Sequence, residues 1–117
     1  MLRGFVISLL AISIAGGAMA KSVSIEKYLK DQADDLSKII NISWLDGAFN
    51  GFESANIELH LLNQKLLYCI HPSMTLTTGD VKNILDGYIY ARKDSIDKAV
   101  PIDMVLLTAL REKYPCQ

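Results

Sequence analysis

The chain has 117 residues, half of them hydrophobic, and a formal net charge of −1. Arg3 is the only lysine or arginine before residue 21, so residues 21–117 carry 11 such residues against 13 aspartates and glutamates, a net charge of −2. This length suits one small domain, and the lack of a basic excess excludes the electrostatic footprint of a nucleic-acid-binding protein.

The first 20 residues have the three-part pattern of a secretory signal peptide. Arg3 supplies the positive start, residues 4–15 are apolar apart from two serines, and residues 18–20 (AMA) place small side chains where a signal peptidase cleaves. The apolar run is about a dozen residues, shorter than the roughly 20 that cross a bilayer. We therefore expect cleavage after Ala20, export and a mature soluble domain of residues 21–117, with a retained N-terminal anchor as the alternative.

The first predicted helix begins at Ile25, where Ser24 can cap the N-terminus and Glu26 suits the positive end of the helix. Its apolar face consists of Tyr28, Leu29, Ala33 and Leu36.

A long amphipathic stretch follows, with apolar residues every three or four positions up to residue 66. The pattern allows either one helix over residues 25–66 or two helices with a break near residues 37–42, where β-branched isoleucines reduce helix propensity. The stripe expected to face the core consists of Ile40, Trp44, Ala48, Phe52, Ala55, Leu59, Leu62 and Leu66.

Gly47 and Gly51 lie four residues apart inside this stretch. A glycine in a helix costs about 1 kcal/mol relative to alanine, so a pair on one face indicates that another backbone approaches closely. Packing within the chain is the favoured explanation, and a contact between the two subunits of a dimer is the alternative.

Two further helices are predicted in the C-terminal half. Thr77 and Asp80 have the spacing of a capping box before a helix that extends to about residue 91. A polar linker, residues 92–98, precedes a last helix that Pro101 can start. The inward-facing residues are Val81, Ile84, Leu85, Tyr88 and Ile89 in the first of these helices, and Ile102, Val105, Leu106, Ala109 and Leu110 in the second.

Cys69 and Cys116 are the only two cysteines. In an exported chain too small for a large core, an even cysteine count favours a disulfide; two free thiols or a metal pair are the alternatives. A zinc site built from both cysteines and His71 lacks the usual ligand spacing. No catalytic or nucleotide-binding motif is present either. We therefore expect an all-α protein, a bundle of about four to five helices with one disulfide, that binds a partner, is not an enzyme and uses no cofactor or metal.

Several segments together resemble the Rap/Tai family of type VI secretion amidase immunity proteins. They are the signal peptide, residues 44–52 (WLDGAFNGF), a Tyr-Cys pair followed by a proline, residues 76–81 (LTTGDV) and residues 106–116 (LLTALREKYPC). The similarity spans about residues 44–116, and the last block with the paired cysteines is its most specific part. The chain departs from the family where Asp80 replaces a frequent glutamine and where Pro72 lies farther from the first cysteine.

This resemblance implies an all-α periplasmic protein, often a homodimer, that binds a papain-like peptidoglycan amidase effector and occludes its active-site cleft. Another periplasmic helical binding protein, such as an acid-stress chaperone, is the alternative. The linker at residues 92–98 is the expected effector-binding segment because scaffolded polar loops commonly carry binding residues. The residues expected to contact the effector are Arg92, Lys93, Asp94, Ser95 and Asp97, and the loop containing His71, Ser73 and Thr75 is the alternative.

Overall fold

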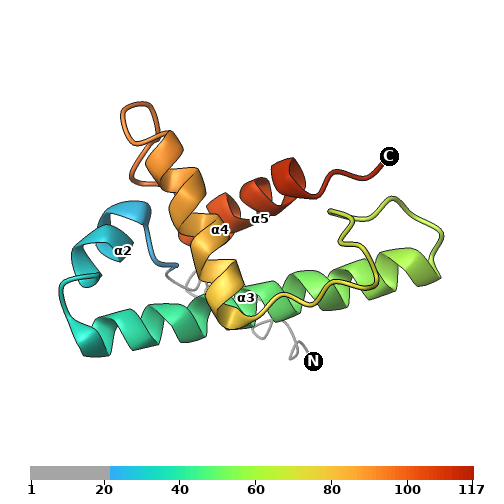
Figure 1. The fold of residues 1–117 in the computed structure, drawn as a ribbon, viewed down its shortest axis with the longest axis horizontal. Coiled ribbons are helices and arrows are strands. Elements are labelled where there is room, and N and C mark those ends of the chain that lie inside the picture. The colour runs from blue at the N-terminus through green and yellow to red at the C-terminus, as the bar shows by residue number, and fades with distance from the viewer. Residues whose placement is uncertain (1–21) are drawn as a thin grey trace, which may run out of the picture.

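Four helices make up the part of the chain that the computed structural model describes, residues 22–117 (Figure 1). They are α2 (Ile25–Asp31), α3 (Asp35–Leu61), α4 (Thr78–Ala91) and α5 (Ile102–Lys113). Within residues 22–117 the only β-type pairing is an isolated bridge between Ser24 and Pro101. The expected all-α class is therefore confirmed, whereas the predicted signal peptide lies outside the described residues.

The break between α2 and α3 lies at residues 32–34, so the position predicted for it, residues 37–42, is wrong. Asp34 caps the N-terminus of α3, and its Oδ2 accepts a hydrogen bond from the Ser37 amide at 2.9 Å. This cap fixes where the helix begins, and the β-branched residues that follow remain helical. Ser24 caps α2 as predicted, with its Oγ 3.2 Å from the Lys27 amide nitrogen.

The face of α3 that meets the core differs from the predicted stripe in the first half of the helix, whereas Phe52 of that stripe packs against the core as expected. Asn41, Leu45 and Phe49 are buried, whereas Ile40 is 58% exposed and Trp44 36% exposed. The buried residues lie one position after the predicted ones, which turns the helix by about 100°. Because apolar residues occur all around α3, their periodicity did not define which side packs inward.

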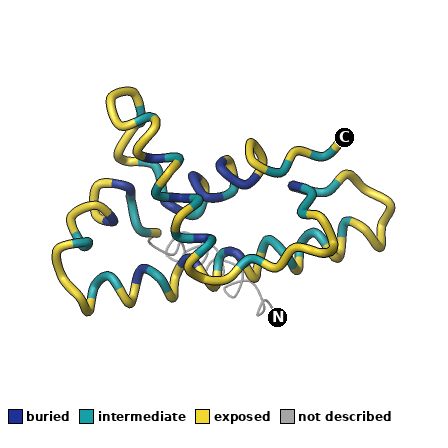
Figure 2. Tube along the Cα trace, in the orientation of Figure 1, coloured by how far each residue is buried: buried dark blue, intermediate teal, exposed yellow. Residues whose placement is uncertain are grey.

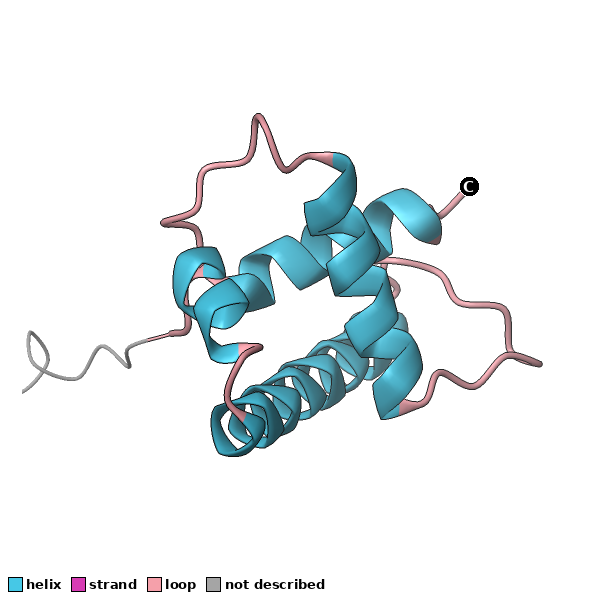
Figure 3. Ribbon diagram, turned by 60° about the vertical axis from the view of Figure 1, so that its left-hand side comes forward, coloured by secondary structure: helices cyan, strands magenta, loops and turns pink. Residues whose placement is uncertain are grey.

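The other three helices lie on one side of α3, as Figure 3 shows in a view nearly along that helix. The predicted capping box of α4 is present, with Asp80 N donating to Thr77 Oγ1 at 3.1 Å and Thr77 N donating to Asp80 Oδ2 at 2.8 Å. All five inward-facing residues predicted for α5 are buried, and Val81, Leu85 and Ile89 of α4 join them in the core. Figure 2 shows these buried positions concentrated where the helices meet.

The N-terminal segment is held against the chain that leads into α5. Ile25 N donates to Val100 O at 3.0 Å, and Ile102 N donates to Val23 O at 2.8 Å. Tyr28, fully buried, donates from its hydroxyl to Asp86 Oδ1 of α4 at 2.5 Å. Although α2 has only seven residues, these bonds fix it to both α4 and α5.

The predicted disulfide joins Cys69 to Cys116, with the two Cα atoms 5.0 Å apart. Cys69 N also donates to Tyr114 O at 2.8 Å, so the α3–α4 connection is fastened to the C-terminal segment by a covalent bond and a hydrogen bond. Within residues 22–117, no helix combines the length and the apolar character needed to span a bilayer.

Candidate interaction surfaces

The segment between α4 and α5, residues 92–98, forms a tight turn that we call the tip. Ser95 N and Ile96 N both donate to Arg92 O, at 3.0 and 2.9 Å, and Ala99 N donates to the Asp97 carboxylate at 3.0 Å. Ile96 packs against the core. The tip stands at the end of α4 farthest from α3, where Figure 1 shows it projecting from the body in orange. It is therefore a preformed, protruding polar turn.

The structure brings the five predicted effector-binding residues together in this turn but gives them different surroundings. Lys93, Asp94, Ser95 and Asp97 are exposed. Arg92 is half-buried, with its guanidinium 3.8 Å from the Tyr88 ring centroid and 2.7 Å from Glu112 Oε2. Arg92 therefore braces the tip against α5, while the Ser95 hydroxyl and the Asp97 carboxylate form hydrogen bonds within the turn. Lys93 and Asp94 form no side-chain hydrogen bond or ion pair within residues 22–117 and can meet a partner.

The alternative loop is closed by its own hydrogen bonds. His71 Nδ1 accepts a bond from Ser73 N at 3.1 Å and lies 2.6 Å from Ser73 Oγ. Thr75 is exposed farther along the same connection. Because Cys69 is bridged, it is neither a nucleophile nor a zinc ligand beside His71.

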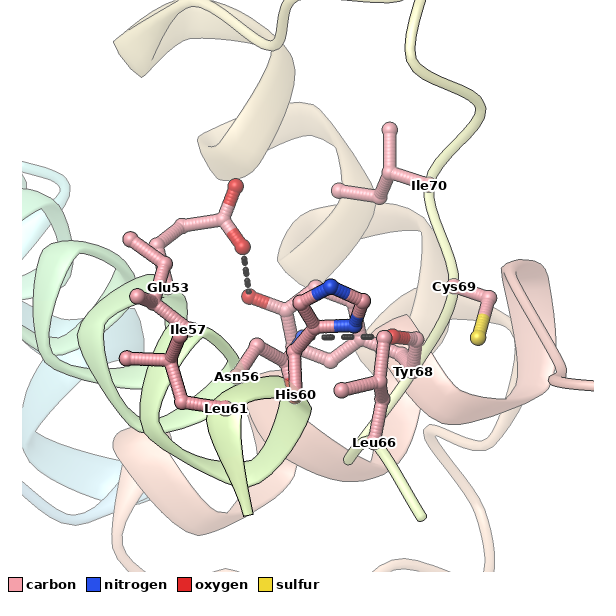
Figure 4. A pocket seen from close by; sticks show the side chains of 9 residues that line it. All are labelled: Glu53, Asn56, Ile57, His60, Leu61, Leu66, Tyr68, Cys69 and Ile70. Atoms are coloured by element: carbon pink, nitrogen blue, oxygen red, sulfur yellow. Dashed lines mark hydrogen bonds between the residues drawn. The ribbon is translucent and has the colours of Figure 1, made fainter. Parts of the chain in front are cut away.

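A mainly apolar pocket of about 440 Å³ lies between the C-terminal half of α3 and residues 66–70 (Figure 4). The Asn56 side chain bridges its walls, accepting from Leu67 N at 2.7 Å and donating to Tyr68 O at 3.1 Å. The Tyr68 hydroxyl donates to Glu53 Oε2 at 3.0 Å. Glu53, Asn56 and the 67–68 segment thus bind one another, whereas the imidazole of His60, which also lines the pocket, forms no hydrogen bond within residues 22–117. Sequence reasoning missed Asn56, which lies among apolar residues with no local pattern to mark it.

The side of α3 that points away from the other helices exposes apolar side chains toward both ends of the helix, with the polar residues Asn50 and Ser54 exposed between them. We call it the outer face; Gly47 and Gly51 lie on it, and a Cβ atom added to either glycine would meet nothing within 4 Å. Packing within the chain, the favoured explanation for these glycines, is therefore wrong. The exposed apolar side chains of the outer face include Leu36, Ile39, Ile40 and Trp44, and at its C-terminal end Ile57 and Leu61, which also line the pocket beside residues 66–70.

The groups with shifted pKa values in residues 22–117 take part in contacts that stabilise the fold. Hydrogen bonds to the Ser37 side chain and amide lower the pKa of Asp34, and bonds from Thr77 lower the pKa of Asp80. Burial and the neighbouring Asp86 raise the pKa of Tyr28 well above its usual value. Between residues 22 and 117, no three His, Cys, Asp or Glu side chains are grouped as metal ligands would be. The perturbed groups belong to helix caps and helix-to-helix contacts, and none is paired as an acid and a base.

Comparison with known proteins assigns no family to the chain. No protein-family model matches it, and neither a curated protein nor a solved structure matches it.

Proposed function

We propose that this protein is a periplasmic immunity protein that binds a peptidoglycan amidase effector of a type VI secretion system and occludes its active site, protecting the producing cell. The observation that carries the proposal is the tip. It is a short polar turn held by three hydrogen bonds at the end of α4, whose 14 residues extend about 20 Å. A turn ordered before binding loses little conformational entropy when it enters a cleft.

The resemblance to the Rap/Tai family supports the same proposal and names the kind of partner. On this proposal the chain carries out no reaction: it binds the amidase and excludes the substrate from the active site of that enzyme. The export signal would place it where an amidase attacks peptidoglycan, and the disulfide suits that oxidising compartment.

We also propose that the protein is a homodimer that associates through the outer face of α3. Gly47 and Gly51 are one helical turn apart and have open space above them, so the backbone of a second copy can approach closely. Leu36 and Leu61, at opposite ends of the face, are 67% and 71% exposed. Exposed apolar side chains grouped near the ends of a helix face are typical of association surfaces.

The test is inhibition of a cysteine–histidine amidase, sought first among the genes adjacent to that of this chain, measured as hydrolysis of purified peptidoglycan. The mature protein should abolish hydrolysis at about one equivalent. Asp94→Lys and Ser95→Lys, both at exposed tip positions, should each weaken inhibition by roughly 30-fold, because an uncompensated interface charge costs about 2 kcal/mol or more. Gln64→Lys adds the same charge as Ser95→Lys, in an exposed loop beyond α3, and should inhibit like the unmodified protein.

The outcomes separate the parts of this proposal. If the mature protein binds no amidase and does not slow hydrolysis, the immunity function is wrong. If it inhibits and both tip variants stay within about threefold of it, the tip is not the contact and the loop containing His71 becomes the next candidate.

The exposed outer face is the observation that favours the alternative, a chaperone-like protein. A chaperone of this kind would suppress aggregation of acid-unfolded periplasmic proteins at substoichiometric or equimolar ratio. The immunity proposal expects no such suppression at concentrations that fully inhibit the amidase.

A further inference from the structure

A second hollow lies beside the tip, between α2 and α4, and we call it the α2–α4 groove. Its volume is about 320 Å³, at the lower end of the roughly 300–1,000 Å³ of small-molecule sites. That size suits one or two side chains of a partner protein. The groove is lined by Leu29, Gln32, Asp86, Ile89, Tyr90 and Lys93.

The groove has an apolar floor and apolar walls. Ile89 is only 5% exposed and forms part of the core, so it provides a fixed floor. Tyr90 is 73% exposed and Leu29 42% exposed, and no helix of the described part covers them. Covering these two side chains would remove apolar surface from water without moving the backbone.

The free charge at the groove is positive. Asp86 is already satisfied, because it accepts from the Tyr28 hydroxyl and from Lys82 Nζ, each at 2.5 Å. Lys93 Nζ lies 5.0 Å from the centre of the Tyr90 ring and forms no ion pair within residues 22–117. An incoming carboxylate would therefore meet an ammonium group beside an apolar wall.

We propose that the α2–α4 groove is a second contact with the effector amidase and receives a surface segment in which a large apolar side chain adjoins an acidic residue. This inference rests on the proposed function. The groove and the tip share Lys93, so a partner seated on the tip reaches the groove without a further movement. The apolar side chain would lie between Leu29 and Tyr90, and the carboxylate would pair with Lys93.

Calorimetry of the mature protein with the same amidase tests the contact. Tyr90→Ala, Leu29→Ser and Lys93→Glu should each weaken binding at least tenfold, and Tyr90→Phe should retain it because the ring remains. Met104→Ser is the matched control, since Met104 is 60% exposed on α5 and lies outside the groove; its affinity should stay within twofold. If the amidase binds and the first three variants all stay within threefold of the unmodified protein, the groove is not a contact.

A measurement without the amidase tests ligand binding in the groove even if the proposed immunity function is wrong. The probes are 3-phenylpropanoate and its neutral amide, titrated into the isotope-labelled protein and followed by amide chemical shifts. The carboxylate should shift Ile89, Tyr90 and Lys93 and bind at least threefold more tightly than the amide, and Lys93→Gln should remove that difference. If neither probe shifts these amides, or the two bind equally, the proposed apolar and acidic recognition is wrong.

Discussion

Two tyrosine hydroxyls are hydrogen-bonded to carboxylates inside the domain. Tyr28 donates to Asp86, and Tyr68 donates to Glu53. Burial is the largest cause that raises the pKa of each hydroxyl, and the neighbouring carboxylate raises it further. A group whose pKa is higher in the folded state stabilises that state fully below its unfolded value, here about 10. The contribution is lost as the pH rises toward the folded value.

We therefore predict that the free energy of unfolding decreases as the pH rises above about 10, and that the decrease is shallower in Tyr28→Phe. Urea unfolding at several pH values, together with tyrosinate absorbance near 295 nm, measures both effects. Part of the absorbance should appear only as the domain unfolds. Tyr90→Phe, at a 73% exposed position, is the control. Full ionisation of Tyr28 and Tyr68 while near-ultraviolet circular dichroism remains native would contradict the prediction.

Residues whose roles depend on neighbours three positions away were predictable from the sequence. Ser24 and Thr77 cap helices as expected because a cap contacts only its own first turn. Asn56 was not predictable, since its partners Leu67 and Tyr68 are 11 and 12 residues distant. Nor was the bracing role of Arg92, whose partner Glu112 lies in another helix, 20 residues away.

At the level of elements, α4 and α5 were predicted well because each has one apolar face and a clear start. For α3, the sequence predicted the long helical stretch but not its inward side. Asn41 and Leu45 face the core, while Ile40 and Trp44, each one position earlier, are exposed. When a helix is apolar on more than one side, the spacing of its apolar residues is compatible with several orientations against the core. The packing of α2, α4 and α5 against it selects one.

The disulfide fastens two elements, the α3–α4 connection and the end of the chain after α5. Cys69 and Cys116 are 47 positions apart, and closing a loop of that length is worth about 4 kcal/mol in the chain-entropy model. We predict that Cys69→Ser with Cys116→Ser lowers the free energy of unfolding by roughly 2–5 kcal/mol. Urea denaturation measures the loss, and the unmodified protein with reductant should behave like the variant. Equal unfolding midpoints with and without reductant would contradict the prediction.

In the whole molecule, the tip and the outer face of α3 lie on different sides of the fold. Thr78 Oγ1 donates to Asp46 Oδ1 at 3.0 Å, which places the start of α4 against the middle of α3. The tip lies at the other end of α4 and projects away from α3 (Figure 1). A dimer formed through the outer face would therefore leave both tips and both α2–α4 grooves accessible, so each copy could hold one amidase.

The two glycines of the outer face give the dimer a distinctive test. A Cβ atom at Gly47 or Gly51 would meet nothing within 4 Å, and replacing a helical glycine with leucine stabilises an isolated helix by about 0.5–1 kcal/mol. We predict that Gly47→Leu and Gly51→Leu raise the stability of the monomer while they weaken dimerisation by holding the two α3 backbones apart. Sedimentation velocity over a range of concentrations measures association, and urea unfolding at low concentration measures monomer stability.

Gly87 supplies the matched control for this last prediction. It lies on α4, is exposed, and also has open space where a Cβ atom would stand. Gly87→Leu should therefore stabilise the monomer by a similar amount and leave dimerisation unchanged, because α4 does not form the outer face. An unmodified protein that sediments as a monomer at high micromolar concentration would refute the dimer. So would Gly47→Leu and Gly51→Leu variants that associate as tightly as Gly87→Leu, since close approach of the two helices would then be unnecessary.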